Sequence, residues 1–404
     1  MKSSISSSYL VFICLAALWA GHAVAQSGKD VQIATGTFTT PGSTGVQSID
    51  SVGFQPKGLL LYGVPVTAEG VTEDSSGWIG FADNAGNQKT VLSYGQDDTG
   101  NSRREQVEDA VMKIMAADDT VLAVATLTSF DGDGFNLNYT VANAGYIVHY
   151  VAFGGSDLEA EVGQWASDES PATGLSLRPD LVFVTCTGQT TGSQNAEHGI
   201  LGMGVFGANT NQWWIGMTQG LNSTPPKDSV LFSDGFMGQF WNGSRSWYAS
   251  LDAITNDGFS WTATPSNTGD DIMYFLALAM PGSDVKVGTF TKETGGSDPQ
   301  DQDLPDLGFF PQVLGLGSAA ETDEVENSAN DAKLSFGVFD GTRQNSMTRT
   351  DRASDSNADQ RADTDDVVLG IATLDAAYDA AAEAKPFTDN SPTLTWSPND
   401  SPAY

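Results

Sequence analysis

The sequence predicts an all-β protein made of three tandem antiparallel β-sandwich, or jelly-roll, domains. Short apolar runs are separated by glycine, asparagine and aspartate at spacings of roughly 10 to 20 residues, which is typical of antiparallel sandwiches. The same blocks of sequence also recur three times in the same order. Helical periodicity is scarce. Residues 104–116 fit a weak helix or a strand, and the alanine-rich residues 374–384 fit one short helix.

The N-terminus has the three parts of a secretory signal peptide. Lys2 gives a charged start, an apolar stretch covers residues 10–20, and Ala23-Val24-Ala25 forms an A-x-A cleavage site. The apolar stretch is too short to cross a bilayer, and no later stretch is longer. We therefore expect residues 1–25 to be a signal peptide, the mature chain to begin at Gln26, and the protein to be secreted without membrane insertion.

Four blocks mark each repeat: an opening strand with a glycine, a proline before an apolar strand, a hairpin, and an acidic turn before another strand. The opening glycines, 127 and 125 residues apart, are Gly36, Gly163 and Gly288. A proline at the start of a strand removes no hydrogen bond of the sheet. The prolines at this position in the three repeats are Pro56, Pro179 and Pro311. We place the domains at 31–155, 156–282 and 283–404. The linkers between them are so short that we expect a stiff rod.

The third domain is predicted to lack its last strand. A closing strand follows the last turn at residues 146–153 in the first copy and 272–278 in the second, whereas the third copy stops at Ser401-Pro402-Ala403-Tyr404. Either the sequence is truncated there, or the terminal repeat is degenerate, or the last sheet has an open edge. An open edge can pair with a strand of another molecule, so self-association through repeat 3 is one hypothesis.

Three motifs of the first copy carry a resemblance to a known class of repeat. Gly53-Phe54-Gln55-Pro56, the turn at residues 128–135 and the strand at residues 146–153 resemble the G-F-Q-P, S-F-D-S-D-G-F and Y-x-V-x-x-x-A patterns of jelly-roll repeats in phage tail and virion structural proteins. Such repeats are similar to concanavalin-like lectin domains. The second and third copies keep the pattern less well. The resemblance implies a sandwich fold, with structural or lectin-like roles as the functions to expect.

The charge balance excludes several classes of partner. The chain has 51 acidic and 18 basic residues and a formal net charge of −33, so nucleic acid and anionic membrane surfaces are poor partners. The acidity fits a solubilising surface, a saline habitat or a site for divalent cations. Once the signal peptide is removed only Cys186 remains, in an apolar run, where we expect a small buried hydrophobe rather than a reactive thiol.

No catalytic residue is predicted. His149 lies within an apolar strand, where we expect a hydrogen-bonded histidine of the sheet, and His198 lies in a polar loop without an accompanying hydrolase motif. A glycoside hydrolase would need alternating acids on one strand, and the nearest run, residues 321–326, lies in a polar stretch that we expect to be a loop. We therefore expect no enzyme.

Two ligand sites are weighed against structural alternatives. Asp131 and Asp133 in a glycine-rich turn could bind calcium, or they could form a plain hairpin turn; no other cofactor is indicated. Trp213 and Trp214 are neighbours on one strand and must point to opposite faces, so we expect one to lie outside the core, where with Asn211 it could bind a glycan. Alternatively, one ring is buried in its domain and the other packs on a neighbouring domain.

The sequence thus favours a non-enzymatic, secreted structural or adhesive surface protein, of a virion or cell-surface appendage type. The alternative is a carbohydrate-binding, lectin-like module array that recognises surface glycans. A glycoside hydrolase is the less favoured third hypothesis.

Overall fold

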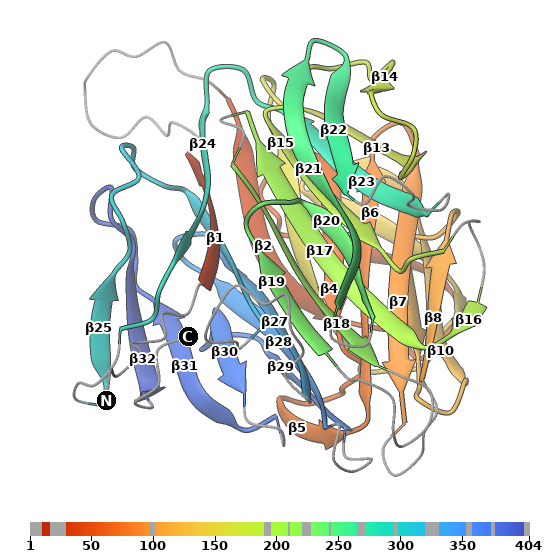
Figure 1. Cartoon of the computed structure of the whole chain (residues 1–404). Coiled ribbons are helices and arrows are strands. Elements are labelled where there is room, and N and C mark those ends of the chain that lie inside the picture. The colour runs from red at the N-terminus through yellow and green to blue at the C-terminus, as the bar shows by residue number, and fades with distance from the viewer. Residues whose placement is uncertain are drawn as a thin grey trace.

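The structure is a computed structural model that describes residues 10–16, 30–96, 102–189, 195–208, 211–219, 228–241, 244–264, 271–293, 298–319, 331–352, 358–372 and 376–399. The all-β prediction is confirmed: the described residues contain strands, turns and irregular segments and no helix (Figure 1). The short helix expected at 374–384 is wrong, because β31 (Tyr378–Ala384) pairs with strands on both sides. The candidate at 104–116 contains two strands.

Repeat 1 forms a large sheet and a smaller one. The large sheet has the order β16-β8-β7-β6-β4-β12-β2, in which the edge strand β16 (Asn195–Glu197) comes from repeat 2, and the small sheet has the order β3-β11-β10-β9. The strands of this part of the chain are β2 (Gln32–Thr39), β3 (Gly45–Ile49), β4 (Pro56–Gly63), β5 (Gly70–Glu73), β6 (Ser75–Asp83), β7 (Gln88–Gly95), β8 (Ser102–Val107), β9 (Met112–Met115), β10 (Val121–Asp131), β11 (Gly134–Val141) and β12 (Ile147–Gly154).

Repeat 2 has the same arrangement. Its large sheet has the order β13-β23-β15-β17-β18-β19 and its small sheet β14-β22-β21-β20. The strands are β13 (Glu159–Ala166), β14 (Ala172–Thr173), β15 (Leu181–Cys186), β16 (Asn195–Glu197), β17 (Gly199–Gly207), β18 (Gln212–Gln219), β19 (Asp228–Phe232), β20 (Met237–Trp241), β21 (Ser244–Thr255), β22 (Gly258–Thr264) and β23 (Ile272–Ala279). The closing strand β23 lies between β13 and β15, as β12 lies between β2 and β4.

Repeat 3 differs at one position. Its large sheet has the order β24-β1-β26-β27-β28-β29-β5, and its small sheet β25-β32-β31-β30. The place of the closing strand is taken by β1 (Leu10–Ala16), the apolar part of the predicted signal peptide, drawn in red beside β24 in Figure 1. The other strands are β24 (Asp284–Phe290), β25 (Gln300–Asp303), β26 (Val313–Ser318), β27 (Asp331–Phe339), β28 (Gln344–Arg352), β29 (Ala358–Asp363), β30 (Leu369–Ala372) and β32 (Thr393–Asn399).

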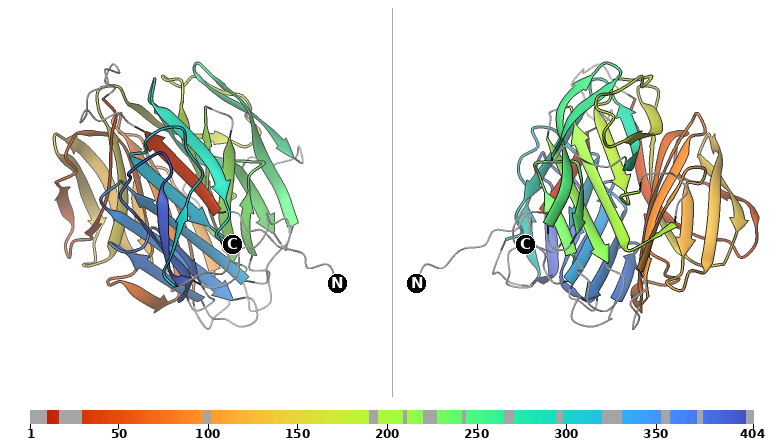
Figure 2. Two further views of the ribbon diagram at one scale, coloured as in Figure 1. Left: turned by 90° about the vertical axis from the view of Figure 1, so that its left-hand side faces the viewer. Right: turned by 45° about the vertical axis from the view of Figure 1, so that its right-hand side comes forward.

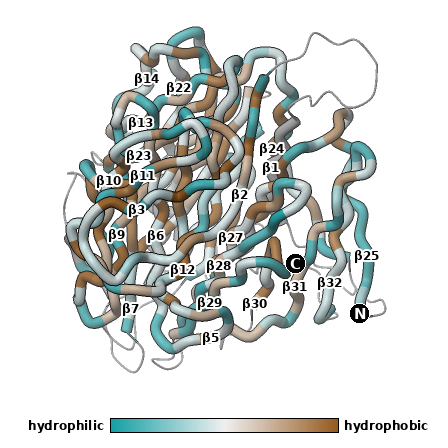
Figure 3. Tube along the Cα trace, turned by 180° about the vertical axis from the view of Figure 1, so that it is seen from behind, coloured by the Kyte–Doolittle hydropathy of each residue, from teal (hydrophilic) through white to brown (hydrophobic). Residues whose placement is uncertain are grey.

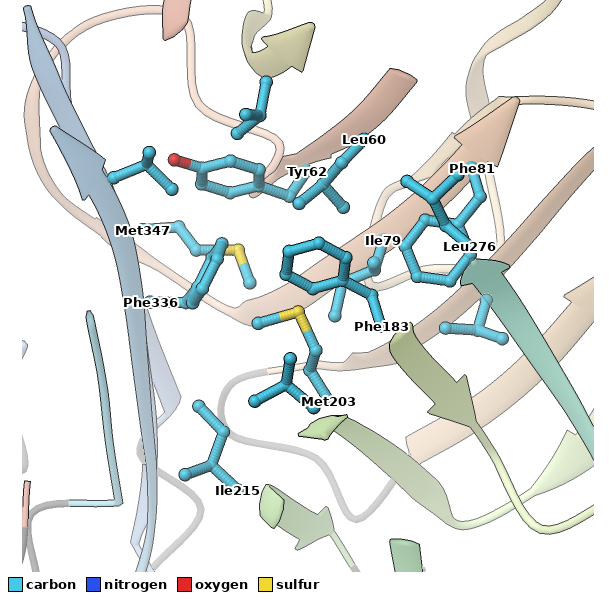
Figure 4. Close-up of a cluster of buried hydrophobic side chains, with 14 of the residues drawn as sticks. Leu60, Tyr62, Ile79, Phe81, Phe183, Met203, Ile215, Leu276, Phe336 and Met347 are labelled. Carbon is cyan, nitrogen blue, oxygen red and sulfur yellow. The ribbon is translucent and has the colours of Figure 1, made fainter. Parts of the chain in front are cut away.

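The three repeats do not form the expected rod. Their large sheets face one another around a shared hydrophobic core, so that each repeat contacts the other two (Figure 2). Figure 4 shows side chains of this central core, with Leu60 and Phe81 from repeat 1, Phe183 and Met203 from repeat 2, and Phe336 from repeat 3. Each pair of sheets also encloses a core of its own. The rod prediction failed because the large sheets are apolar on both faces, and each must bury its second face against a neighbour.

Hydrogen bonds between side chains and backbone close the three repeats into a ring. The opening strand of each repeat is bonded to a side chain from the hairpin turn of another repeat. The pairs are Val162 N to Asp83 Oδ2 at 2.7 Å, Asn211 Nδ2 to Val287 O at 2.8 Å, and Thr35 N to Asp340 Oδ2 at 3.0 Å. The contacts therefore run from repeat 1 to 2, from 2 to 3 and from 3 back to 1, as in a cyclic trimer whose subunits are joined in one chain.

Edge strands are also shared between repeats. β5 of repeat 1 pairs with β29 of repeat 3, and β16 of repeat 2 pairs with β8 of repeat 1. The corresponding segment of repeat 3, residues 320–330, lies outside the described residues, as does the acidic run at 321–326. Figure 3 shows hydrophobic residues along the inner strands and hydrophilic residues in the turns. Edge pairing covers backbone groups that would otherwise be open to another chain.

A buried polar network joins all three repeats. The guanidinium of Arg349 is fully buried and donates to Ser93 Oγ at 2.8 Å, to Ser75 O at 2.6 Å and to Gln219 Oε1 at 3.0 Å. Gln219 in turn donates to Asp351 Oδ2 at 2.8 Å. Burial lowers the pKa of Arg349 to about 9, so the side chain stays charged at neutral pH.

Candidate functional site

The predicted glycan-binding tryptophans are both buried. Trp213 is 0% exposed and belongs to the central core, whereas Trp214 is 1% exposed and belongs to the core of repeat 2. The expectation that one ring lies outside the core is wrong. The two rings do point to opposite faces of β18, but this sheet is covered on both faces. The alternative, in which one ring packs against neighbouring repeats, is what the structure contains, and neither ring is accessible to a sugar.

Asn211 lies next to this strand and has a structural contact. The residue is exposed, and its Nδ2 donates to the carbonyl oxygen of Val287 at 2.8 Å. This bond is one of the three that close the ring of repeats. The predicted set of Trp213, Trp214 and Asn211 therefore does not converge on one surface site, since only Asn211 reaches solvent.

The carboxylates proposed for calcium accept hydrogen bonds from neighbouring residues, Asp131 within its own hairpin and Asp133 from the turn before β4. Asp131 accepts hydrogen bonds from Ser129 Oγ and Asn136 Nδ2, and Asp133 Oδ1 accepts the backbone N–H of Gly53 at 2.8 Å. Across the described part of the chain, no group of three or more His, Cys, Asp or Glu side chains is placed to hold a metal ion. The geometry of this turn supports the hairpin alternative.

Burial shifts the pKa values of the histidines and the cysteine in the described part of the chain. His149 is 0% exposed, its ring lies 5.2 Å from that of Tyr62, and burial lowers its pKa to about 3. It is a buried histidine of the sheet as expected, but neither ring nitrogen has a hydrogen-bond partner. Burial raises the pKa of Cys186 to about 12, and the thiol is free but inaccessible. His198 is half-buried, and burial followed by the nearby charge of Arg104 lowers its pKa.

An open cleft lies where repeat 3 meets repeat 1. It has a volume of about 590 Å³ and is lined by the opening strand β2, the turn at Val52–Phe54, and three turns of repeat 3. Phe310 stands at its rim with 52% of its surface exposed, one of three large hydrophobic side chains that are exposed among the described residues. Phe387 packs near it with 6.5 Å between ring centroids, and in turn contacts Phe339 at 4.9 Å. One side of the cleft is therefore aromatic, and its exposed ring, Phe310, packs on Phe387, which in turn packs on Phe339.

The polar groups of the cleft are of two kinds. The Asp340 carboxylate already accepts three hydrogen bonds, from the backbone N–H groups of Thr35, Thr342 and Arg343 at 3.0, 3.0 and 2.7 Å. By contrast, Gln312 and Thr342, which also line the cleft, have neutral polar side chains. A ligand would therefore meet neutral donors and acceptors beside aromatic rings.

The sequence carries one local signal for this cleft, in the turn that precedes an apolar strand of repeat 3. Gly53-Phe54-Gln55-Pro56 in repeat 1 corresponds to Gly308-Phe309-Phe310-Pro311 in repeat 3, and both glycines have the left-handed backbone of a turn, with φ of 95° and 82°. Repeat 3 has phenylalanine where repeat 1 has Gln55. An extra aromatic residue in a surface turn was the available signal.

No protein-family model matches the chain, and no curated protein matches it significantly. The described segments include no helix with the length and hydropathy needed to cross a membrane.

Proposed function

We propose that this chain is a non-enzymatic, secreted adhesive surface protein that binds a neutral glycan in the cleft between repeats 1 and 3. The observation that carries the proposal is the exposed ring of Phe310 at the rim of a 590 Å³ cleft. Sugars stack their apolar faces on aromatic rings and direct hydroxyls to neutral polar groups. Phe310 and Phe387 supply the rings, and Gln312 and Thr342 supply the polar partners.

The charge of the molecule supports a neutral rather than an anionic ligand. The net charge of −33 repels anionic polymers, and the one carboxylate of the cleft, on Asp340, is already hydrogen-bonded. The non-enzymatic part is supported by the states of His149 and Cys186, whose shifted pKa values keep both uncharged near neutral pH.

A glycan array screened with the full chain tests the proposal. We expect binding to neutral glycans that Phe310→Ala weakens by about tenfold, the equivalent of one aromatic contact. Val46→Ala is the matched control, because Val46 is also an exposed hydrophobic residue, 67% exposed, and does not line the cleft. The proposal is wrong if no neutral glycan binds, or if both variants bind as the unaltered chain does.

A structural role in a virion or surface appendage is the second candidate. The observation in its favour is the closed ring of three sandwiches around one core, which makes a stiff block suited to repeated assembly. Electron microscopy of the source particles or cells, labelled with an antibody to the chain, would find regular arrays in this case. Isolated, unordered labels would favour the adhesive role alone.

A further inference from the structure

The groove between β24 and β26 has the features of a site that binds a separate strand. In repeats 1 and 2 the equivalent groove is filled by the closing strand of the same repeat, β12 or β23. In repeat 3 it is filled by β1, which comes from the opposite end of the sequence. Leu10–Ala16 pair with Asp284–Phe290 on one side, and residues 11–15 pair with residues 313–317 on the other.

The register of β1 is that of a true closing strand. In repeat 2, Phe275 lies opposite Gly163 on one side and Val184 on the other. In repeat 3, Phe12 lies opposite Gly288 and Leu316. Gly163 and Gly288 are the equivalent opening-strand glycines, and Val184 and Leu316 each lie five residues after the proline of their repeat.

The opening-strand glycine explains why an aromatic residue belongs at this place. A Cβ atom on Gly163 would come within 2.3 Å of the Phe275 ring, and one on Gly36 would come within 2.6 Å of the Tyr150 hydroxyl oxygen. The glycine therefore makes room for an aromatic side chain from the closing strand. Repeat 3 has a glycine, Gly288, at the same position. The groove therefore favours an apolar strand with an aromatic residue opposite that glycine.

We propose that the groove between β24 and β26 is a strand-acceptor site, closed by the chain's own residues 10–16 until the predicted cleavage after Ala25. Cleavage then frees the groove for an apolar strand of another polypeptide, with an aromatic residue opposite Gly288. The inserted strand receives backbone hydrogen bonds from both neighbours, which is the basis of strand addition between proteins. This inference is independent of the glycan cleft.

Disulfide trapping in the full chain tests the internal strand. Cys14 lies opposite Lys286, so the thiol introduced by Lys286→Cys should form a disulfide with Cys14 under mild oxidation, since paired strands lie within disulfide range. Thr289→Cys on the same strand is the control, because its partner is Val11. Cys186 is buried and will not compete. The proposal is overturned if the two variants form the disulfide with Cys14 equally or if neither does so.

Peptide uptake tests the acceptor role. The chain is given a specific protease site after Ala25, and a fluorescent peptide with the sequence of β23, Ile272–Ala279, is added before and after cleavage. We expect one peptide per cleaved chain and at least tenfold weaker binding to the uncleaved chain. A peptide with alanine at the Phe275 position should also bind at least tenfold more weakly. Equal binding of the two peptides, or of the two forms of the chain, would overturn the proposal.

Substitution of the groove glycine provides a third test, again measured by peptide uptake. Gly288→Val should abolish uptake, whereas Gly132→Val should not, because a Cβ atom at residue 132 meets no atom within 4 Å. Should Gly288→Val fail to fold, the alanine-substituted peptide decides the register alone.

Discussion

The large inner sheets and the small outer sheets of this protein bury their residues in different ways. All nine residues of β6 in repeat 1 and all nine of β17 in repeat 2 are buried, because these strands have a core on each face. In the outer strand β11, buried and more exposed residues alternate over most of its length. The difference shows that the repeats are held together by the faces of the inner sheets that pack on the central core, and not by their linkers alone.

Polar residues sharpen this comparison, because the inner sheets also bury charge. Arg349 makes its three hydrogen bonds only when Ser75 and Ser93 of repeat 1 and Gln219 of repeat 2 are all in place. An ion pair on the outside, such as Arg103 with Asp119 at 3.3 Å, depends on no other repeat. Substitutions at the two kinds of site should therefore differ in size.

The largest effect is expected from Arg349→Ala. Removal of the guanidinium leaves buried partners in repeats 1 and 2 without their donor, so the free energy of unfolding should fall by about 3 to 5 kcal/mol. Arg103→Ala removes an exposed pair and should change it by no more than about 1 kcal/mol. Urea unfolding of both variants measures the difference. Similar losses in the two variants would contradict the shared polar centre.

The adjacent tryptophans should prove equally important for stability. Trp213→Ala and Trp214→Ala each remove a fully buried ring from an inner sheet, and each should lower the free energy of unfolding by about 3 to 5 kcal/mol. A small loss for either one, of the size seen at a surface site, would show that its face of β18 is open to solvent. Thermal unfolding of the two variants gives the answer.

His149 should make the protein sensitive to acid. Its pKa is about 3 in the folded chain and near 6.5 when unfolded, so below pH 6.5 only the unfolded state takes up the proton. Its contribution should lower stability by about 1.4 kcal/mol per pH unit as the pH falls from 6.5 toward 3. Unfolding of His149→Leu at pH 6.5 and pH 5 should show a loss about 2 kcal/mol smaller than in the unaltered chain. Parallel losses would mean that His149 is hydrated in the fold.

The smallest effect is expected in the turn once considered for calcium. Asp133→Ala removes the bond to the N–H of Gly53 and should lower stability by about 1 kcal/mol. The loss should be the same with calcium and with a chelator, because the carboxylate is bonded to Gly53 rather than to a metal ion. A melting temperature of the unaltered chain that rises with calcium, and fails to do so in the variant, would restore the metal hypothesis.

Much of the strand content was predictable from sequence, because strands and turns leave local patterns. Glycine and proline residues mark where strands begin and end, and this pattern is enough to predict the all-β class. The arrangement of the repeats was missed although a signal existed: runs such as Leu59-Leu60-Leu61-Tyr62 are apolar at every position, which is typical of a strand buried on both faces. The extra phenylalanine at Phe310 is a local signal for the cleft, but its place beside Phe54 of repeat 1 depends on the ring of contacts, which leaves no local pattern in the sequence.

The central claim, that the three repeats pack around one core, is tested most directly by small-angle X-ray scattering of the full chain in dilute solution. A single compact body of this length should have a radius of gyration of about 21 Å. Three separate domains in line, each of roughly 125 residues, should give about 32 Å. A value near the first supports the closed arrangement, and a value near the second would show that the repeats form a rod and that the shared core does not exist.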